Sequence, residues 1–276
     1  MSLLVTLLNS LLTNLFDLLL WPLRSLDPIW ALTFVSCLSG LLMVWIFGKV
    51  SDQQVIRQVR DRIRGNLLGV RLYQHNIKVV LQLQGAILRD TLTYMKHAIL
   101  PMLVLIVPVG LILAQLNLRF ALRPLEPGRP VVVKVKLAEA SYLKQDSHLQ
   151  APAAISIETQ GVRIEPENEI AWRIRAEHLG YYSLKVVADG NEIEKALWVG
   201  DGWGAVSPIR TAHIGNMLLY PGEPPIDPPG VIDAVEVKYP PLTLSLFGWD
   251  VHWLVFFLFV SIFFGFLCKR LLGVEL

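Results

Sequence analysis

The chain has 276 residues, of which 53% are hydrophobic and only 17% are charged. Soluble domains carry roughly 25% charged residues, so this composition excludes a disordered chain and disfavours a wholly soluble enzyme. The net charge is only +2, and the two cysteines, Cys37 and Cys268, both lie in apolar runs. That placement excludes a disulfide framework and a cysteine-rich zinc site. The composition predicts a membrane protein with a water-exposed portion.

Residues 1–28 are predicted to form an amphipathic helix that lies in the membrane interface. At 100° per residue, the polar side chains fall within an arc of roughly 140°, and the rest of the surface is almost entirely apolar. The segment lacks the basic start and the small-residue cleavage site of a signal peptide. The alternative is a further transmembrane helix whose polar stripe contacts other helices. The polar residues are Ser2, Thr6, Asn9, Ser10, Thr13, Asn14 and Asp17.

Three apolar runs predict transmembrane helices at 29–47, 98–118 and 249–270. A helix needs about 20 apolar residues to cross a hydrocarbon core of roughly 30 Å. Neither of the first two runs contains a charged residue, although the second contains Pro101 and Pro108. We expect a multi-span α-helical membrane protein.

Residues 49–97 are predicted to form a basic cytoplasmic helical hairpin. Apolar residues recur at helical spacing in both halves, and Tyr73–Asn76 interrupts the pattern as a turn would. The basic face suits anionic lipid headgroups, and the alternative is binding of ribosomal RNA or a nascent chain. We expect no binding to DNA. The basic face comprises Arg57, Arg60, Arg64 and Arg71.

Residues 119–219 are predicted to form an extracytoplasmic β-sandwich, because short alternating strands are separated by turn residues. Asp189–Asn191 has the composition of a hairpin turn, and Trp172 is expected in the core. A tryptophan in mid-strand, followed by Gly180–Tyr182 before the next strand, resembles immunoglobulin-like domains. Residues 220–248, with seven prolines before position 242, are predicted to be a stiff strap that returns the chain to the membrane. Val235–Tyr239 inside this strap is a candidate for one more strand.

The charge distribution predicts the topology. Residues 49–97 hold nine basic and three acidic residues, a net charge of +6, whereas residues 119–250 hold 13 basic and 17 acidic residues, a net charge of −4. Basic loops remain in the cytoplasm. We therefore expect a multi-pass protein of the cell (inner) membrane, with 49–97 and the C-terminus cytoplasmic and 119–250 periplasmic.

The sequence contains no Walker loop, HExxH, CxxC or GxSxG motif, so we expect no enzyme activity, cofactor or metal. The few polar groups in or beside the apolar runs are candidates for an intramembrane groove, since polar groups in lipid tend to face protein or a wet cavity. The alternatives are small-residue helix packing and anchoring at the interface. The groove candidates are Thr33, Ser36, Gly40, Gln115, Arg119 and His252.

The order of these segments resembles the YidC/Oxa insertase superfamily, in particular its three-span branch of archaeal YidC-like proteins and the insertase subunit of the endoplasmic reticulum membrane complex. The cues are a basic hairpin after the first span, a second span that opens with Ile99-Leu100-Pro101-Met102, and a third that begins with Trp249-Asp250-Val251-His252-Trp253. The resemblance implies a groove, open to the cytoplasm and the lipid, that receives a client's hydrophobic segment, and a hairpin that helps capture the client.

Two features depart from that family. Its five-span members carry an arginine inside the groove, whereas Arg119 lies at the outer end of its span, and its reduced members lack a β-domain between the second and third spans. We expect an insertase-like protein that assists the insertion or assembly of client membrane proteins in contact with membrane lipid. The alternative is a non-catalytic structural subunit of a membrane complex, whose outer β-domain docks a partner.

Overall fold

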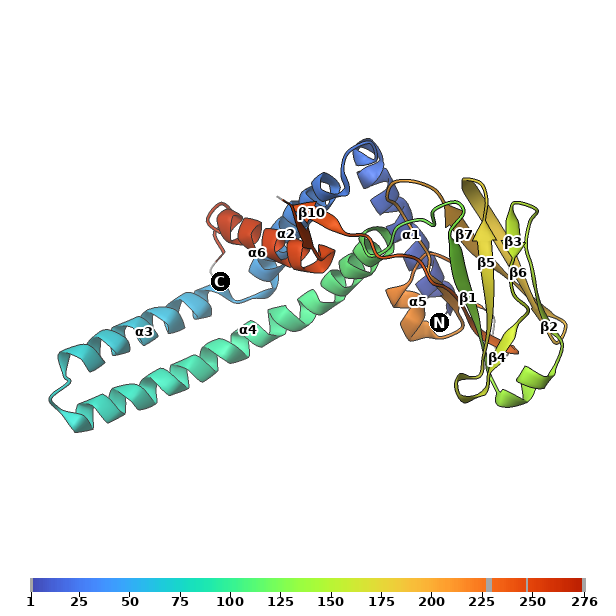
Figure 1. Cartoon of the computed structure of the whole chain (residues 1–276). Helices are drawn as coiled ribbons and strands as arrows, with labels where there is room; N and C mark the ends of the chain where they lie inside the picture. Colours follow the sequence, from blue (N-terminus) through green and yellow to red (C-terminus); the bar gives the residue numbers. More distant parts are fainter. Residues whose placement is uncertain (1, 227–229, 247, 275–276) are drawn as a thin grey trace. The chain divides into compact units, whose positions relative to one another are not determined.

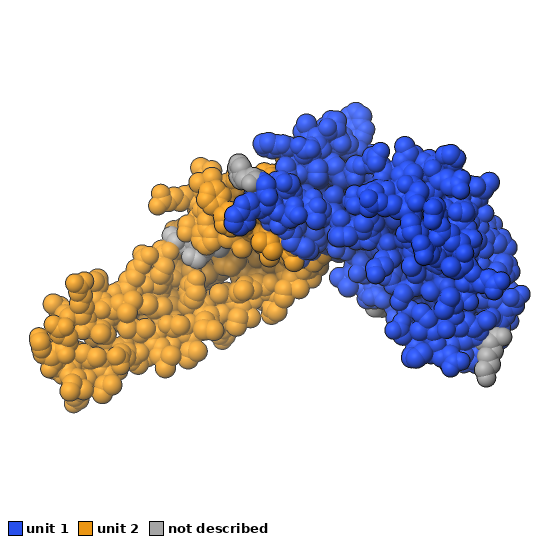
Figure 2. Space-filling view, in the orientation of Figure 1, with its two compact units in different colours: residues 1–32, 111–253 blue, residues 33–110, 254–276 orange. Residues whose placement is uncertain are grey.

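The computed structural model describes residues 2–226, 230–246 and 248–274 (Figure 1). The chain divides into two compact units. Unit 1 comprises residues 1–32 and 111–253, and unit 2 comprises residues 33–110 and 254–276 (Figure 2).

Three helices are long and apolar enough to cross a membrane, over Val5–Leu23, Pro28–Val50 and Ile77–Phe120. The first lies in the segment that we expected in the interface. The predicted third span, 249–270, is shorter than expected: its helix, α6 (Trp253–Cys268), has 16 residues, a length of about 24 Å. Residues before the helix form β11 (Trp249–Val251), which pairs with β10 (Leu244–Leu246).

Unit 2 contains the predicted hairpin. Its helices are α3 (Gln53–Leu72) and α4 (Ile77–Phe120), whose first 34 residues belong to this unit, and Figure 1 shows them side by side. The turn after Leu72 is confirmed, since the amide of Asn76 donates to the carbonyl of Tyr73. Gly69 allows close approach, because a Cβ atom there would lie 3.0 Å from a methyl group of Leu83.

The hairpin and the second span are one helix, not two segments. α4 runs for 44 residues through Pro101 and Pro108. A proline removes one backbone donor, yet such residues are tolerated in transmembrane helices where the freed groups find other partners. The boundary expected at position 98 is therefore absent.

The second helix contact in unit 2 joins α2 (Pro28–Val50) to α6. A Cβ atom at Gly40 would overlap with the carbonyl oxygen of Ser261, and one at Gly265 would lie 3.2 Å from a methyl group of Val44. Small residues let two helix backbones approach closely where no hydrophobic effect drives them together.

Unit 1 holds two antiparallel sheets that share one hydrophobic core. The larger has the order β3-β5-β1-β9-β8, with β4 also paired to β5, and the smaller has the order β2-β6-β7. The strands are β1 (Pro130–Leu137), β2 (Ser147–Gln150), β3 (Ile155–Ile157), β4 (Val162–Ile164), β5 (Glu169–Ala176), β6 (Gly180–Ala188), β7 (Asn191–Val199), β8 (Ile209–Thr211) and β9 (Ile232–Val237).

The alternating pattern of the strands determines this core. Trp172 on β5 is 4% exposed and lies opposite Val133 of β1, which confirms it as a core residue. Asp189 and Gly190 both have positive φ, as a two-residue type I′ turn requires, and connect β6 to β7.

The predicted strap, 220–248, is more than a linker. It contributes β9, which pairs with β1 on one side and β8 on the other. The prolines that suggested an extended linker flank this strand, and its own six residues, Ile232–Val237, bury four side chains. The sandwich therefore extends beyond residue 219.

Candidate functional site

The C-terminal end of α4 carries Arg119, a buried and multiply hydrogen-bonded arginine. Arg119 donates to both the side-chain and the backbone oxygen of Gln115, at 2.6 and 3.1 Å. It also donates to the carbonyl of Thr13 at 3.1 Å and to the carboxylate of Asp17 at 2.8 Å. Its guanidinium lies 5.6 Å from the ring centroid of Phe16. The charge is thus paired, hydrogen-bonded and covered by one helix.

That helix is α1 (Ser2–Leu20), and its polar stripe contacts protein. Residues at spacings of three and four share a helix face, which aligns Asn9, Thr13 and Asp17. Asn9 donates to the carbonyl of Met217 at 2.9 Å, and Gln115 donates to the hydroxyl of Thr13 at 3.2 Å. The opposite face of α1 exposes leucines at 7, 8, 11, 15 and 18.

This contact buries two of the six residues that the sequence indicated as groove candidates. Gln115 and Arg119 are each 1% exposed, because α1 covers them. The sequence correctly indicated that both residues share one side of the helix. The physical reason for the difference is that an arginine at an apolar helix end needs a counter-ion, which α1 supplies as Asp17.

The remaining groove candidates have other surroundings. On α2, Ser36 is buried, Thr33 is half-buried, and Gly40 lies in the contact with α6, so Gly40 serves helix packing. In unit 1, His252 is exposed just before α6, with its ring 5.7 Å from that of Trp253. Such a position suits anchoring at an interface.

The basic face predicted on α3 lies along one side of that helix. Arg57, Arg64 and Arg71 are exposed, and Arg60 is half-buried. Arg57 also donates to the carbonyl of Gly273 at 3.0 Å, which ties the C-terminal segment to the hairpin.

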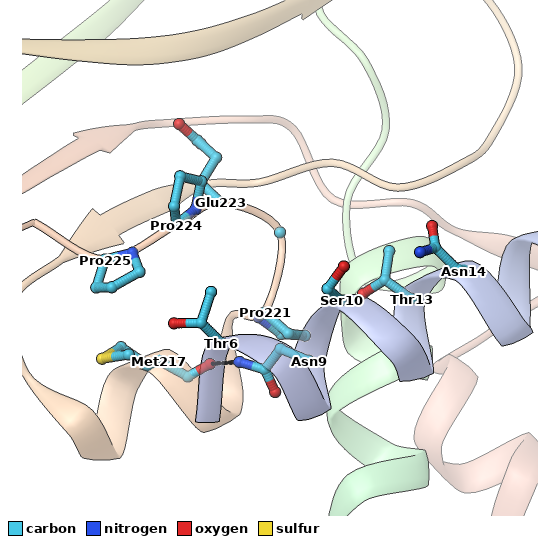
Figure 3. Close-up of a pocket in the computed structure, with 11 residues that line it drawn as sticks. Thr6, Asn9, Ser10, Thr13, Asn14, Met217, Pro221, Glu223, Pro224 and Pro225 are labelled. Atoms are coloured by element: carbon cyan, nitrogen blue, oxygen red, sulfur yellow. Dashed lines mark hydrogen bonds between the residues drawn. The ribbon is translucent and has the colours of Figure 1, made fainter. Parts of the chain in front are cut away.

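A cavity of about 290 Å³ lies between α1 and the segment 221–225 (Figure 3). One wall consists of hydroxyl and amide side chains of α1, and the other is rich in proline. The sequence indicates the polar stripe but gives no signal for the second wall, which lies more than 200 positions away. The lining residues from α1 are Thr6, Asn9, Ser10, Thr13 and Asn14.

Beside this cavity, Lys195 and Glu223 form a buried ion pair. Burial lowers the pKa of Lys195, and the neighbouring Glu223 carboxylate opposes that effect. Glu223 also accepts from the amide of Ala196 at 3.0 Å, while the hydroxyl of Tyr239 accepts from the amide of Trp198 at 3.0 Å. These contacts cover the edge of β7. The sequence contains a signal for Lys195. Side chains alternate between the two faces of a strand, so Lys195 lies on the same buried face of β7 as Leu197.

Within 2–226, 230–246 and 248–274, no three His, Cys, Asp or Glu side chains are grouped so that they could hold a metal ion. Comparison with known proteins gives no matching family model, no matching curated protein and no matching solved structure.

Proposed function

We propose that this protein is an insertase-like membrane protein, which assists the insertion or assembly of other membrane proteins without a cofactor. The hairpin 53–97 and the C-terminus would lie in the cytoplasm, and the β-sandwich on the other side of the membrane. The charge difference of +6 against −4 supports this orientation.

One observation carries the proposal: an exposed apolar seam runs along α4 from the hairpin into the predicted span. Its members are between 50% and 64% exposed. From Leu88 onward they alternate in steps of four and three, the spacing that packs one helix against another. α3 contacts the opposite side of α4 at Leu83. The seam consists of Leu81, Leu88, Leu92, Met95, Ile99, Met102 and Ile106.

This seam offers an apolar helix a continuous path. Burying a leucine-sized side chain contributes about 1.5–3 kcal/mol, so the half-exposed members of the cytoplasmic part offer roughly 3–6 kcal/mol together. Because α4 is unbroken, a client helix that binds at Leu88 can move toward Ile106 without losing apolar contacts. Arg89 and Lys96 flank the seam and are exposed, which favours clients with neutral or acidic flanks.

The polar cluster at Arg119 supports a second role, toward the polar flank of a client. A polar flank that crosses the membrane must leave water, at a cost of several kcal/mol unless it finds hydrogen-bond partners. The neutralised stripe of α1 offers hydroxyl and amide groups beside the outer end of α4. The seam would bury the apolar helix of a client. The stripe would lower the free-energy cost of moving the client's polar flank out of water.

Photo-crosslinking tests the seam. A photoreactive residue at Leu92 should capture several translating membrane proteins, one for each client that is expressed. The same residue at Gln82, which is exposed about 100° around the helix from Leu81, is the matched control. Equal yields at both positions, or crosslinks to lipid alone, would contradict the proposal.

Thiol labelling tests the topology. A cysteine at His75, in the hairpin turn, should be protected from an impermeant reagent in intact cells. A cysteine at Glu192, an exposed position on β7, should react. The reverse pattern would overturn the proposed orientation.

The alternative function is a structural subunit whose β-domain docks a partner, and the strand order favours it specifically. In immunoglobulin constant-type domains the sheets have the orders ABED and CFG. The orders β9-β1-β5-β3 and β2-β6-β7 match these if β9 replaces strand A. Tyr182, near the start of β6, donates to the carbonyl of His178 at 3.0 Å, as the tyrosine corner of such domains does. Capture at Leu92 of one stoichiometric protein, whatever is translated, would favour this function.

A further inference from the structure

We infer that the cavity between α1 and residues 221–225 binds an extended, uncharged polypeptide segment. This inference rests on the proposed function: the segment is the polar flank of a client that crosses the membrane. The inference depends on the chemistry of the two walls and on the position of the cavity beside Arg119.

The first wall presents hydroxyl and amide groups in a row. From Thr6 to Asn14 the row rises about 12 Å along α1, the length of three to four extended residues. Hydroxyl and amide side chains both donate and accept, as a peptide backbone requires of a partner. Ser10 and Asn14 are exposed, and neither side chain has a hydrogen-bond partner among the described residues. Figure 3 shows Ser10, Thr13 and Asn14 along one helix.

The second wall leaves the side chains of Ser10 and Asn14 available to a ligand. Pro221, Pro224 and Pro225 have no backbone N–H and cannot donate across the cavity. Their rings provide apolar contacts for the aliphatic parts of a peptide.

The cavity carries no unbalanced charge. Among the described lining residues, Glu223 is the one that is ionisable, and it is bound by Lys195 and by the amide of Ala196. A phosphate would find no free cation, and a lysine of a client would find no free carboxylate, so each would lose its hydration without compensation. The lining residues that the structure describes include no aromatic ring on which a sugar would stack. These features select a neutral peptide over a lipid phosphate, a glycan or a basic flank.

Thr13 connects the cavity to the outer end of α4. Its side chain lines the cavity and bonds with Gln115, while its carbonyl accepts from Arg119. The polar flank of a client that passes the C-terminal end of α4 would therefore contact the hydroxyl and amide side chains of α1.

The test uses the full chain in native membranes, with a photoreactive residue at Ser10. The matched control is Leu11, which is also exposed but lies on the apolar side of α1. The probe is a ribosome-bound client with the flank Gly-Ser-Asn-Thr-Ser. We expect the crosslink from Ser10 to this flank to exceed that from Leu11 at least fivefold, and to fall at least threefold when two serines become lysines.

A second variant separates this inference from the proposed function. Ser10→Trp fills the cavity and should abolish the crosslink formed from Asn14, whereas Leu11→Trp should leave it intact. If the client inserts and is captured at Leu92, but Ser10 gives no more product than Leu11 or yields only lipid or glycan, the cavity inference is wrong and the proposed function stands. If capture at Leu92 fails while the purified chain still gives the Ser10 crosslink with the free peptide Gly-Ser-Asn-Thr-Ser, the cavity inference stands and the insertase proposal is wrong.

Discussion

The guanidinium of Arg119 lies 2.8 Å from the carboxylate of Asp17, 102 positions earlier in the chain. This ion pair fixes α1 against the C-terminal end of α4. Arg24 also approaches the same carboxylate, at 3.6 Å, but it is largely exposed. Arg119, in contrast, is buried, and a buried charge is costly without a counter-ion. Asp17 therefore matters mainly as the counter-ion of Arg119.

A double-mutant cycle tests that pair. Asp17→Asn should lower the free energy of unfolding by about 2 kcal/mol, because it leaves a buried charge without a counter-ion. In an Arg119→Gln background, the same change should cost less than half as much. The exposed Asp27→Asn is the control and should be neutral in both backgrounds. Equal costs of Asp17→Asn in both backgrounds would mean that the two residues are not coupled.

Glycine substitutions test the contact between α2 and α6. Gly40→Ala should destabilise the protein by about 1–3 kcal/mol, because its Cβ meets the backbone of Ser261. Gly110→Ala is the matched control in α4, where nothing lies within 4 Å of the added Cβ. It should be neutral or stabilise by up to about 1 kcal/mol. Thermal unfolding of the two variants measures the difference, and similar melting temperatures would contradict the contact.

Fragments test the boundary of the sandwich. A fragment of residues 122–246 should be soluble and unfold cooperatively, whereas 128–220 should not fold, because it lacks β9 between β1 and β8. Trp172→Ala in the longer fragment should cost about 3–5 kcal/mol. Circular dichroism and urea unfolding provide the measurements. A folded 128–220 fragment would show that β9 is dispensable.

The Lys195–Glu223 pair gives a prediction about pH. Lys195→Met alone should destabilise the sandwich by about 3 kcal/mol, and Lys195→Met with Glu223→Gln should recover much of the loss. Because burial lowers the pKa of Lys195 in the folded state, the unfolded chain holds the extra proton between that pKa and the ordinary value of 10.5. The free energy of unfolding of the wild type, relative to Lys195→Met, should therefore rise with pH in that window. A difference that falls with pH there would contradict the assignment.

Much of this fold follows from local patterns. The hairpin turn at Tyr73–Asn76, the type I′ turn at Asp189 and the burial of Trp172 are encoded within a few residues of each site. The pairing of Asp17 with Arg119 is not, because no local signal selects one carboxylate among many for a distant arginine. For β9 the sequence indicates a strand at Val235–Tyr239, which overlaps the observed Ile232–Val237. Its place between β1 and β8 cannot be predicted locally, because that pairing depends on tertiary structure. The sequence predicts a helix in the second half of the hairpin, but which of its apolar side chains remain exposed depends on the face that α3 covers.

We propose that the seam on α4 carries client segments, and a reconstituted insertion assay measures this function. The purified protein in lipid vesicles should increase the insertion of a single-span client over empty vesicles. Leu88→Ser with Leu92→Ser should reduce that increase at least fivefold. A control pair, Gln82→Ser with Thr93→Ser, should leave it unchanged, since both residues lie off the seam. Equal insertion by the seam variant and the wild type would contradict the account.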